Sequence, residues 1–262
     1  MSDAVATETV QTALENNVLW IRLIRPESMN AVNGELRAAL AAAVRDAERN
    51  PEARVVVVTG TGRAFCSGAD VRELAGRDGG IDVIRGEYER ILTGLHNMPK
   101  PTIAALNGVA GGVGASIAMA CDLRFAVPEA SLVEAFVKIG LTPDGGASWL
   151  LPRFIGTART FELMYTGDPL PATEAERLGL YNKVLAGDQL EPTVRELAER
   201  LATGPAMALA AAKRSVNFSV YSTFEEALDF EFLLQAVQMQ GQDFKEGVTA
   251  FLEKRKPSFK GE

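Results

Sequence analysis

The feature that most constrains the fold is a run of four consecutive valines, 55–58, inside the segment 54–59. An uninterrupted β-branched run predicts a strand buried on both faces, as in a parallel sheet covered by helices. It follows a predicted strand at 18–24 and a predicted helix at 34–48, for which Asn33 is a candidate N-cap. A strand, a helix and a second strand in this order form a βαβ-type unit. The sequence therefore predicts an α/β fold.

The α/β pattern continues to about residue 150 and then gives way to helices. Further strands are predicted at 102–106 and 122–127, with a helix at 81–96 before them. From about Thr157 the apolar spacing is helical, and no Ser/Gly/Pro-rich linker separates the two parts. We therefore expect one domain with a helical appendage. The helices predicted in this second part span 173–178, 190–201, 206–216, 224–240 and 242–254.

Composition excludes several kinds of site and partner. The chain has one histidine, His96, and two cysteines, Cys66 and Cys121, too few for most zinc sites, so no metal is expected. We interpret His96 as a helix cap or a surface residue. Two cysteines form no disulfide framework, which favours a reducing, cytoplasmic location. The net charge of −7 argues against nucleic acid or an anionic membrane as a partner.

Neither a secretory signal nor a membrane-spanning segment is expected. The N-terminal residues include acidic side chains and no apolar core, unlike a signal peptide. No uncharged apolar run in the chain is long enough to cross a bilayer as a helix.

A glycine cluster at 108–114 follows a predicted strand and precedes a predicted helix at 115–120. It would let the backbone approach a ligand and leave N–H groups free at a helix N-terminus, as an oxyanion or phosphate requires. Ile117 replaces the third glycine of a dinucleotide motif, and no Gly-Lys-Ser/Thr follows. Tight helix–strand packing is the alternative. A second break at 64–70 is predicted to be a turn, and donors from two such loops can converge on a carbonyl oxygen.

Asp144 is a candidate general base in a Thr-Pro-Asp-Gly-Gly turn. An ordinary turn is the alternative interpretation. A carboxylate held among apolar groups would have a raised pKa and could accept a proton near neutral pH. The apolar residues that flank the Asp144 turn in the sequence are Phe136, Ile139, Leu141, Trp149 and Leu150.

The basic segment 251–256 is either a solvated helix end or a phosphate site.

These motifs, in this order, resemble the crotonase, or enoyl-CoA hydratase/isomerase, family over nearly the whole chain. The resemblance implies an α/β fold, a crotonase-like spiral of ββα turns over residues 1–200. A C-terminal helical trimerisation region over 201–262 would belong to the same structural unit. It also implies a homotrimer or homohexamer. The matching segments are 25–31, 62–73, 100–122, 172–180 and 250–256.

The resemblance also implies an acyl-CoA thioester as substrate, so that coenzyme A is part of the substrate and no separate cofactor is needed. The thioester oxygen would accept hydrogen bonds from the backbone N–H groups of Ala69 and Val113, although most family members have glycine in place of the valine. Phe251 and Lys254 would lie at a neighbouring subunit. The residues implied in CoA binding are Met29, Ala31, Ser67, Gly68, Asp70, Val71, Phe251 and Lys254.

The chain departs from the hydratases of this family, which use two glutamates to hold and activate water. Ser116 and Phe136 occupy those positions, and with Leu141 they are assigned to the acyl pocket. Asp144 instead matches the catalytic aspartate of 1,2-epoxyphenylacetyl-CoA isomerases and Δ3,Δ2-enoyl-CoA isomerases. It also matches the nucleophile of 4-chlorobenzoyl-CoA dehalogenase, but Glu89 stands where that enzyme needs a histidine.

The predicted activity is therefore the movement of a double bond in an enoyl-CoA through a dienolate, with Asp144 as acid and base. Two alternatives stay open. One is an enoyl-CoA hydratase, which adds water to a 2-enoyl-CoA. The other is a non-catalytic subunit that binds acyl-CoA.

Overall fold

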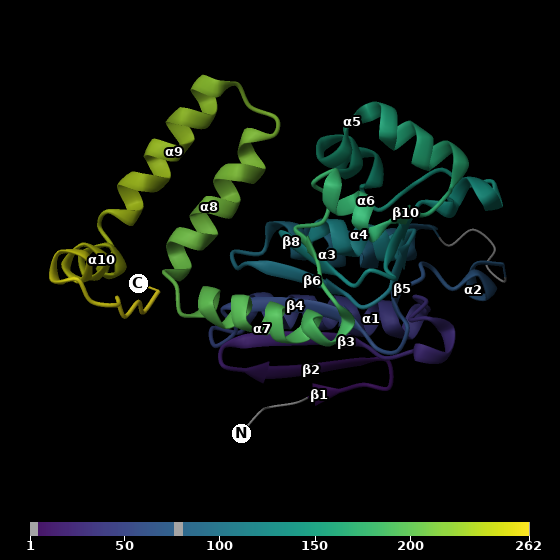
Figure 1. Ribbon diagram of the computed structural model, residues 1–262, viewed down its shortest axis with the longest axis horizontal. Coiled ribbons are helices and arrows are strands. Elements are labelled where there is room, and N and C mark those ends of the chain that lie inside the picture. The colour runs from purple at the N-terminus through teal and green to yellow at the C-terminus, as the bar shows by residue number, and fades with distance from the viewer. Residues whose placement is uncertain (1–4, 76–80, 262) are drawn as a thin grey trace.

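The computed structural model describes residues 5–75 and 81–261, and it is built around a seven-stranded sheet (Figure 1). The strand order is β1-β2-β3-β4-β6-β8-β11. From β3 to β11 neighbouring strands are parallel, whereas β1 and β2 extend one edge with antiparallel pairing. The predicted α/β fold is confirmed. The strands are β1 (Val5–Ala6), β2 (Val10–Glu15), β3 (Val18–Leu23), β4 (Val55–Gly60), β6 (Thr102–Leu106), β8 (Leu123–Ala126) and β11 (Lys183–Val184).

A second sheet of four strands lies where the sequence predicts only turns and loops. Its order is β10-β9-β7-β5, and the pairs β5–β7 and β7–β9 are parallel. The predicted turn at 64–70 and the predicted loop at 108–114 are therefore wrong in part, because a short strand opens each of them. Strands this short carry no readable alternation. They are β5 (Ala64–Cys66), β7 (Val109–Gly111), β9 (Ser131–Val133) and β10 (Leu170–Pro171).

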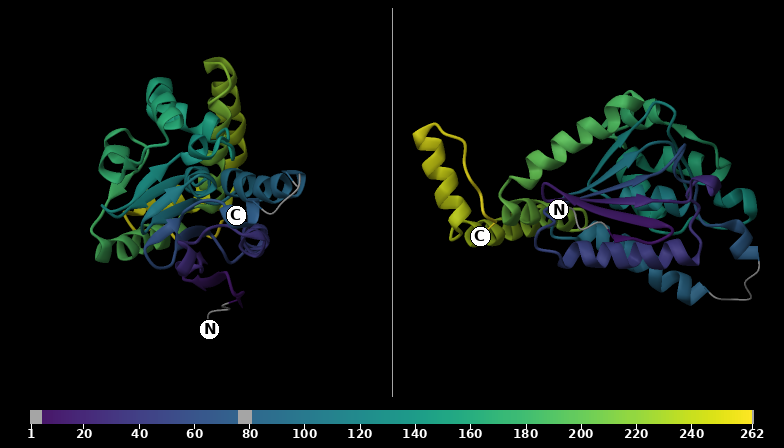
Figure 2. Two further views of the ribbon diagram at one scale, coloured as in Figure 1. Left: turned by 90° about the vertical axis from the view of Figure 1, so that its right-hand side faces the viewer. Right: turned by 90° about the horizontal axis from the view of Figure 1, so that it is seen from below.

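The valine run forms β4, in the interior of the large sheet and fully buried, as predicted. Helix α1 (Gly34–Arg49) contacts β2 and β3, and α7 (Gly187–Ala202) contacts β4 and β6. These two helices cover opposite faces of the sheet (Figure 2). Asn33 caps α1 as predicted, because its side chain accepts a hydrogen bond from the Leu36 N–H at 2.9 Å.

Helix α3 (Ile81–Asn97) confirms the predicted helix at 81–96. Helix α5 (Ala147–Thr166) begins ten residues before the predicted onset of helical structure. Pro152 and the non-helical Gly156, where φ is 75°, interrupt α5 and weaken its signal in the sequence. The other helical segments are η1 (Pro26–Ser28), α2 (Val71–Ala75), α4 (Val113–Ala120), η2 (Ala135–Ile139), α6 (Ala172–Arg177), α8 (Ala206–Ser219), α9 (Phe224–Gln238) and α10 (Gln242–Glu253).

Helices α8, α9 and α10 extend away from the rest of the molecule (Figures 1 and 2). Lys213 anchors α8, since its Nζ lies 3.0 Å from the Asp122 carboxylate and donates to the Leu95 carbonyl at 2.8 Å. The predicted boundary at residue 200 falls in the last turn of α7. Several large apolar side chains on α8 to α10 are exposed, among them Val216, Phe224, Phe232, Leu233, Phe251 and Leu252.

Within the described residues, no helix combines the length and apolar character needed to cross a bilayer.

Candidate active site

Two glycine turns meet at the end of the small sheet. Gly68 follows β5 and Gly112 follows β7, with φ of 113° and 49°, values that side-chain-bearing residues rarely adopt. A Cβ added to Gly68 would lie 3.0 Å from the Gly111 carbonyl oxygen and 3.9 Å from the Gly112 Cα. The turns are therefore in direct contact. Because β5 and β7 are paired, the segments that follow them and carry Ala69 and Val113 begin side by side at the end of the sheet.

The backbone N–H groups of Ala69 and Val113 donate to no acceptor among the described residues, whereas the N–H group of one adjacent residue on each turn is hydrogen-bonded. The Asp70 N–H donates to the Val32 carbonyl at 3.0 Å, and the Gly112 N–H donates to the Val133 carbonyl at 2.8 Å. Val113 is also the first residue of α4, where the helix dipole favours negative charge. The geometry thus offers two fixed donors on adjacent turns.

Close packing holds the start of α4 in place. A Cβ at Gly114 would lie 2.2 Å from the Cys66 carbonyl oxygen, so only glycine lets the helix approach β5 this closely. The Cys66 thiol is fully buried, and burial raises its pKa to about 12, which excludes it as a nucleophile. The cluster at 108–114 therefore provides both tight packing and a free donor, which were proposed as alternatives.

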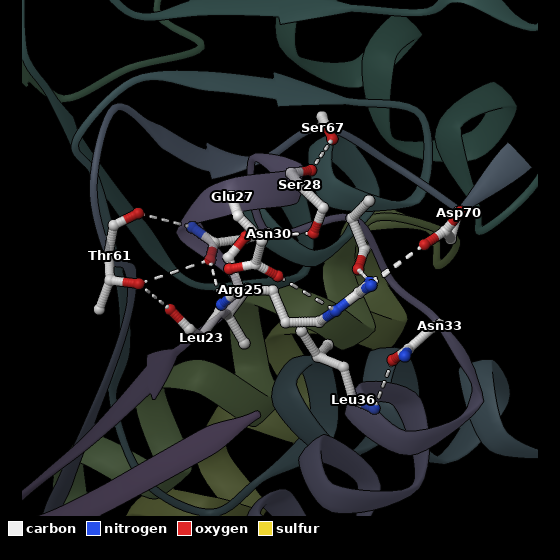
Figure 3. Close-up of polar contacts among 11 residues, drawn as sticks. Leu23, Arg25, Glu27, Ser28, Asn30, Asn33, Leu36, Thr61, Ser67 and Asp70 are labelled. Carbon is white, nitrogen blue, oxygen red and sulfur yellow. Dashed lines mark hydrogen bonds and ion pairs between the residues drawn. The ribbon is translucent and has the colours of Figure 1, made fainter. Parts of the chain in front are cut away.

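A polar network joins the loop before α1 to the loop after β5 (Figure 3). The Arg25 guanidinium donates to Asp70 Oδ2 at 3.2 Å and also to the Ala31 carbonyl. The Ser67 N–H donates to the Met29 carbonyl at 3.0 Å. The structure therefore brings together Met29, Ala31, Ser67, Gly68 and Asp70, five of the residues assigned to CoA binding. Val71 lies beside them and is exposed.

The sequence analysis assigned no role to Arg25 or to Asn30, which organise this network. Asn30 is fully buried, with φ of 55°, and its Oδ1 accepts from the Arg25 N–H at 2.8 Å. Its Nδ2 donates to the carbonyls of Thr61 and Ala64 at 2.9 and 2.8 Å. Its Oδ1 also accepts from the Thr61 hydroxyl at 3.5 Å. A buried polar side chain whose hydrogen bonds are all satisfied is a structural clamp, and Asn30 holds the Met29–Ala31 turn against β5.

Asp144 lies in the wall of a cavity of about 670 Å³. The expectation that apolar residues bury it is wrong in part, because Asp144, Ile139 and Leu141 are all exposed. Gly145 and Gly146, which follow Asp144 directly, have positive φ of 60° and 82° and form the turn. Partial burial of the carboxyl still raises the pKa of Asp144 above its usual value.

The turn after Asp144 packs directly on α4. Ser116, fully buried on that helix, donates through Oγ to the Asp144 carbonyl at 3.4 Å. A Cβ at Gly145 would lie 2.6 Å from the same Oγ. Phe136 is half-buried, and its ring lies 3.5 Å from the position of a Cβ on Gly112. Ser116 is three residues after Val113, so the Asp144 turn packs on α4 about one helical turn along the axis from the residue that carries the free N–H.

Aromatic side chains form part of the remaining cavity wall. Trp149 stacks edge-on against His96 with ring centroids 5.7 Å apart, and it lies 6.2 Å from Tyr221. His96 lies in the last turn of α3, at a helix end as expected, and its half-buried ring also forms part of this wall. Burial and the positive charge of Lys213 lower the pKa of His96, so it is neutral at pH 7. Glu89, exposed on α3, lines the same cavity.

A carboxyl that the sequence analysis missed lies deeper. Glu134 follows β9, is fully buried, and its two oxygens accept no hydrogen bond from any described residue. Burial and the negative charge of Asp144 raise the pKa of Glu134 to about 8. Its position directly after a short strand that the sequence did not reveal explains why it was missed.

Phe251 and Lys254 do not join the site within one chain. They end α10, on the projecting helices (Figure 1), and Phe251 is among the most exposed side chains. Lys254 closes the helix in the left-handed conformation, with φ of 54°. No group of three or more His, Cys, Asp or Glu side chains within the described residues is arranged to hold a metal ion.

Comparisons with known proteins agree with this architecture. The family model for enoyl-CoA hydratase/isomerase matches residues 13–262. A "Probable enoyl-CoA hydratase" of Rhodobacter capsulatus is 40% identical, with 97% of this chain and 98% of that protein covered. The 1,2-epoxyphenylacetyl-CoA isomerase of Escherichia coli K12 is 38% identical, with coverage of 97% and 99%.

Solved structures show the same fold. The enoyl-CoA hydratase of Bacillus anthracis superposes with a TM-score of 0.88 at 32% identity, covering 100% of this chain and 99% of that one. An enoyl-CoA hydratase from Polaromonas sp. JS666 has a TM-score of 0.90 at 34% identity, with coverage of 96% and 100%.

Proposed function

The chain belongs to the enoyl-CoA hydratase/isomerase family, and on this premise we propose that it moves a carbon–carbon double bond within an acyl-CoA thioester. The observation that supports this most strongly is the position of Asp144. Its turn packs on α4 at Ser116, three residues after Val113, and Asp144 lines the cavity. Ser116 and Phe136 occupy the positions at which the hydratases carry their water-activating glutamates, and neither is a base.

In the proposed reaction on a 3-enoyl-CoA such as 3-hexenoyl-CoA, the Asp144 carboxylate removes a proton from the thioester α-carbon. The electrons of that C–H bond form a double bond to the thioester carbon, and the negative charge moves to the thioester oxygen of a conjugated dienolate. From a 2-enoyl-CoA the same dienolate forms when the proton is taken from the carbon two bonds beyond the α-carbon and the old double bond shifts. The N–H groups of Ala69 and Val113 stabilise this oxygen. Asp144 then returns the proton to a different carbon. One base is sufficient because no water is consumed.

The coenzyme A portion is assigned to the surface beside the Arg25–Asp70 network. Met29, Ala31 and Ser67 gather there around the Gly68 turn. Phe251 and Lys254 would reach this surface only from a neighbouring subunit of a trimer or of a hexamer. The exposed apolar side chains of α8 to α10 support such an assembly, because contiguous apolar surface of this kind favours a protein partner. The absence of a separate cofactor and the cytoplasmic location stay predictions.

Hydration is the second candidate function, and Glu89 is the observation that favours it. This carboxyl lines the same cavity as Asp144 and could activate a water molecule there. Relatives named as hydratases and as an isomerase are similarly close to this chain.

The decisive experiment offers the protein 3-hexenoyl-CoA and crotonyl-CoA separately and follows each product by mass and absorbance. Isomerisation changes the absorbance of 3-hexenoyl-CoA without a change of mass. Hydration adds the mass of one water to crotonyl-CoA. We expect the first result and at most weak hydration. Rapid hydration without isomerisation would overturn the proposal, and binding without either reaction would identify a non-catalytic acyl-CoA-binding subunit.

A further inference from the structure

Glu134 is a buried carboxyl that the proposed mechanism does not use. Its exposed fraction is 0%, and neither oxygen receives a hydrogen bond from the described residues. Leaving a buried polar group without partners is costly, and leaving a buried charge without a partner costs far more. A purely structural position would favour an apolar side chain here. The presence of a carboxyl at this position therefore needs a chemical explanation.

The small sheet places Glu134 beside the oxyanion donors. Val133, the last residue of β9, accepts a hydrogen bond at 2.8 Å from the N–H of Gly112. Glu134 is thus the next residue along, opposite the turn that presents Val113. Alternation along β9 puts its side chain on the same side as Leu132, which is also fully buried. The carboxyl is thus buried next to the Gly112 turn, near enough to Asp144 for the charge of that carboxylate to act on it.

The charge environment of Glu134 contains no compensating cation. Of the charged groups in the described chain, Asp144 is the one that shifts the pKa of Glu134, and it raises this pKa, as burial does. Ser116 on α4 is uncharged, and β7 and β10 carry no titratable side chain. Most charged side chains of η2, α5 and α6 form ion pairs: Lys138 with Asp168, Arg159 with Glu162 and Glu174, and Arg177 with Glu174. Arg153 on α5 stacks on Trp149 and donates to its carbonyl at 2.6 Å, and Glu176 on α6 carries no positive charge.

We propose that Glu134 remains a neutral carboxylic acid throughout turnover and is a positioning residue that restricts the negative charge of the site to Asp144 and the enolate. This inference rests on the proposed function. If Glu134 lost its proton, a second buried negative charge would face both the Asp144 carboxylate and the developing oxyanion. Like charges in such a site cannot coexist without a large cost, so the ionised form would be inactive.

The test compares the pH dependence of kcat for isomerisation in the wild type and in Glu134→Gln. Glutamine has the same shape as the neutral acid and cannot ionise. With a pKa of about 8 for Glu134, the wild-type rate should fall about 30-fold between pH 7 and pH 9.5. The variant should change less than about twofold over the same interval. Glu129→Gln, an exposed carboxyl in the turn before β9, is the matched control and should keep the wild-type profile.

A second measurement does not depend on activity. The pKa of Glu134 is higher in the folded chain than its ordinary value of 4.5. The folded state therefore holds this proton more tightly, and its stability is complete at low pH and decreases as pH rises from about 4.5 towards 8. Glu134→Gln should remove this decrease and be more stable than the wild type at pH 8, as followed by thermal unfolding.

The two proposals fail separately. If the wild type moves no double bond, the proposed function is wrong, while the unfolding series still decides the protonation of Glu134. If the wild type isomerises but Glu134→Gln retains the alkaline decline, the Glu134 inference is wrong and the function stands. An unchanged pH dependence of stability in the variant would overturn the inference as well.

Discussion

The two halves of the site use different chemical groups, backbone in one and side chains in the other. The half around Ala69 and Val113 uses backbone groups, fixed by strand pairing and by glycines that no other residue could replace without strain. The half around Asp144 uses side chains on an exposed turn, next to a cavity of about 670 Å³. The first half is rigid and independent of side-chain identity. The properties of the second half depend on which side chains are present.

This difference assigns separate tasks to the two halves. A backbone donor can stabilise any thioester enolate, so the first half defines the shared chemistry of the family. Valine at position 113 is compatible with that role, because the donor is the main-chain N–H and the side chain is buried. Under the proposed function, we assign the type of reaction to the side chains at positions 116, 136 and 144.

The largest expected effect comes from Asp144→Asn, which tests the side-chain half alone. Asparagine keeps the shape of the turn but cannot accept the proton. We expect kcat for isomerisation to fall about 100- to 10,000-fold, the range attributed to a positioned base. Affinity for the acyl-CoA, measured by calorimetry, should stay unchanged because the CoA surface lies at the other half. Full activity in this variant would remove Asp144 from the mechanism.

Gly68→Ala tests the backbone half and should have the next largest effect. At φ of 113° an added Cβ lies 3.0 Å from the Gly111 carbonyl oxygen, so the turn must shift and the Ala69 N–H moves with it. Loss of one oxyanion donor typically costs roughly 100- to 1,000-fold in rate. Steady-state kinetics should show the larger loss in kcat and a smaller rise in KM, because Gly68 is also assigned to CoA binding.

The matched control for that variant is Gly187→Ala. Gly187 opens α7, and a Cβ there meets no atom within 4 Å. This substitution should leave kinetics and thermal unfolding close to the wild type. If Gly68→Ala were as harmless as the control, the backbone half would not carry the donor that we assign to it.

The same contrast explains what could be predicted from the sequence. The valine run and the cap at Asn33 are strong local signals, because each depends only on a few neighbouring residues, and both are confirmed. The glycine cluster also marked a close backbone approach. In these cases the physical cause lies within the segment itself.

Features that depend on contacts between distant segments were harder to predict from the sequence. The strands of the small sheet have at most three residues each, and they exist through pairing with segments far away in the chain. The burial of Glu134 and the place of His96 in the cavity wall follow from that pairing and from the packing of α5. The exposure of Asp144 could not be read from its apolar neighbours, since some of them, such as Leu150, are buried while others, such as Ile139 and Leu141, are exposed.

A smaller effect is expected from Asp70→Asn, which weakens the link between the two loops of the CoA surface. The Arg25–Asp70 pair is 3.2 Å long, and both side chains are less than one-fifth exposed. Loss of one ion pair of this kind costs about 1 kcal/mol, which corresponds to about fivefold in KM. The value of kcat should not change. Asp46→Asn, which breaks the exposed Arg45–Asp46 pair, is the control and should leave KM unaltered.

The smallest effect is expected from Glu89→Gln, and it decides whether the side-chain half contains one working carboxylate or two. Glu89 is exposed on the cavity wall, and the isomerase mechanism gives it no proton to carry. Isomerisation of 3-hexenoyl-CoA should therefore stay within about twofold of the wild type, the usual range for a surface substitution. The same preparation is then assayed with crotonyl-CoA. If Glu89 activates water, the wild type will hydrate this substrate and the variant will lose about 100-fold of that rate or more. Such a loss would mean that the exposed turn supports hydration as well, and that Asp144 alone does not determine the reaction.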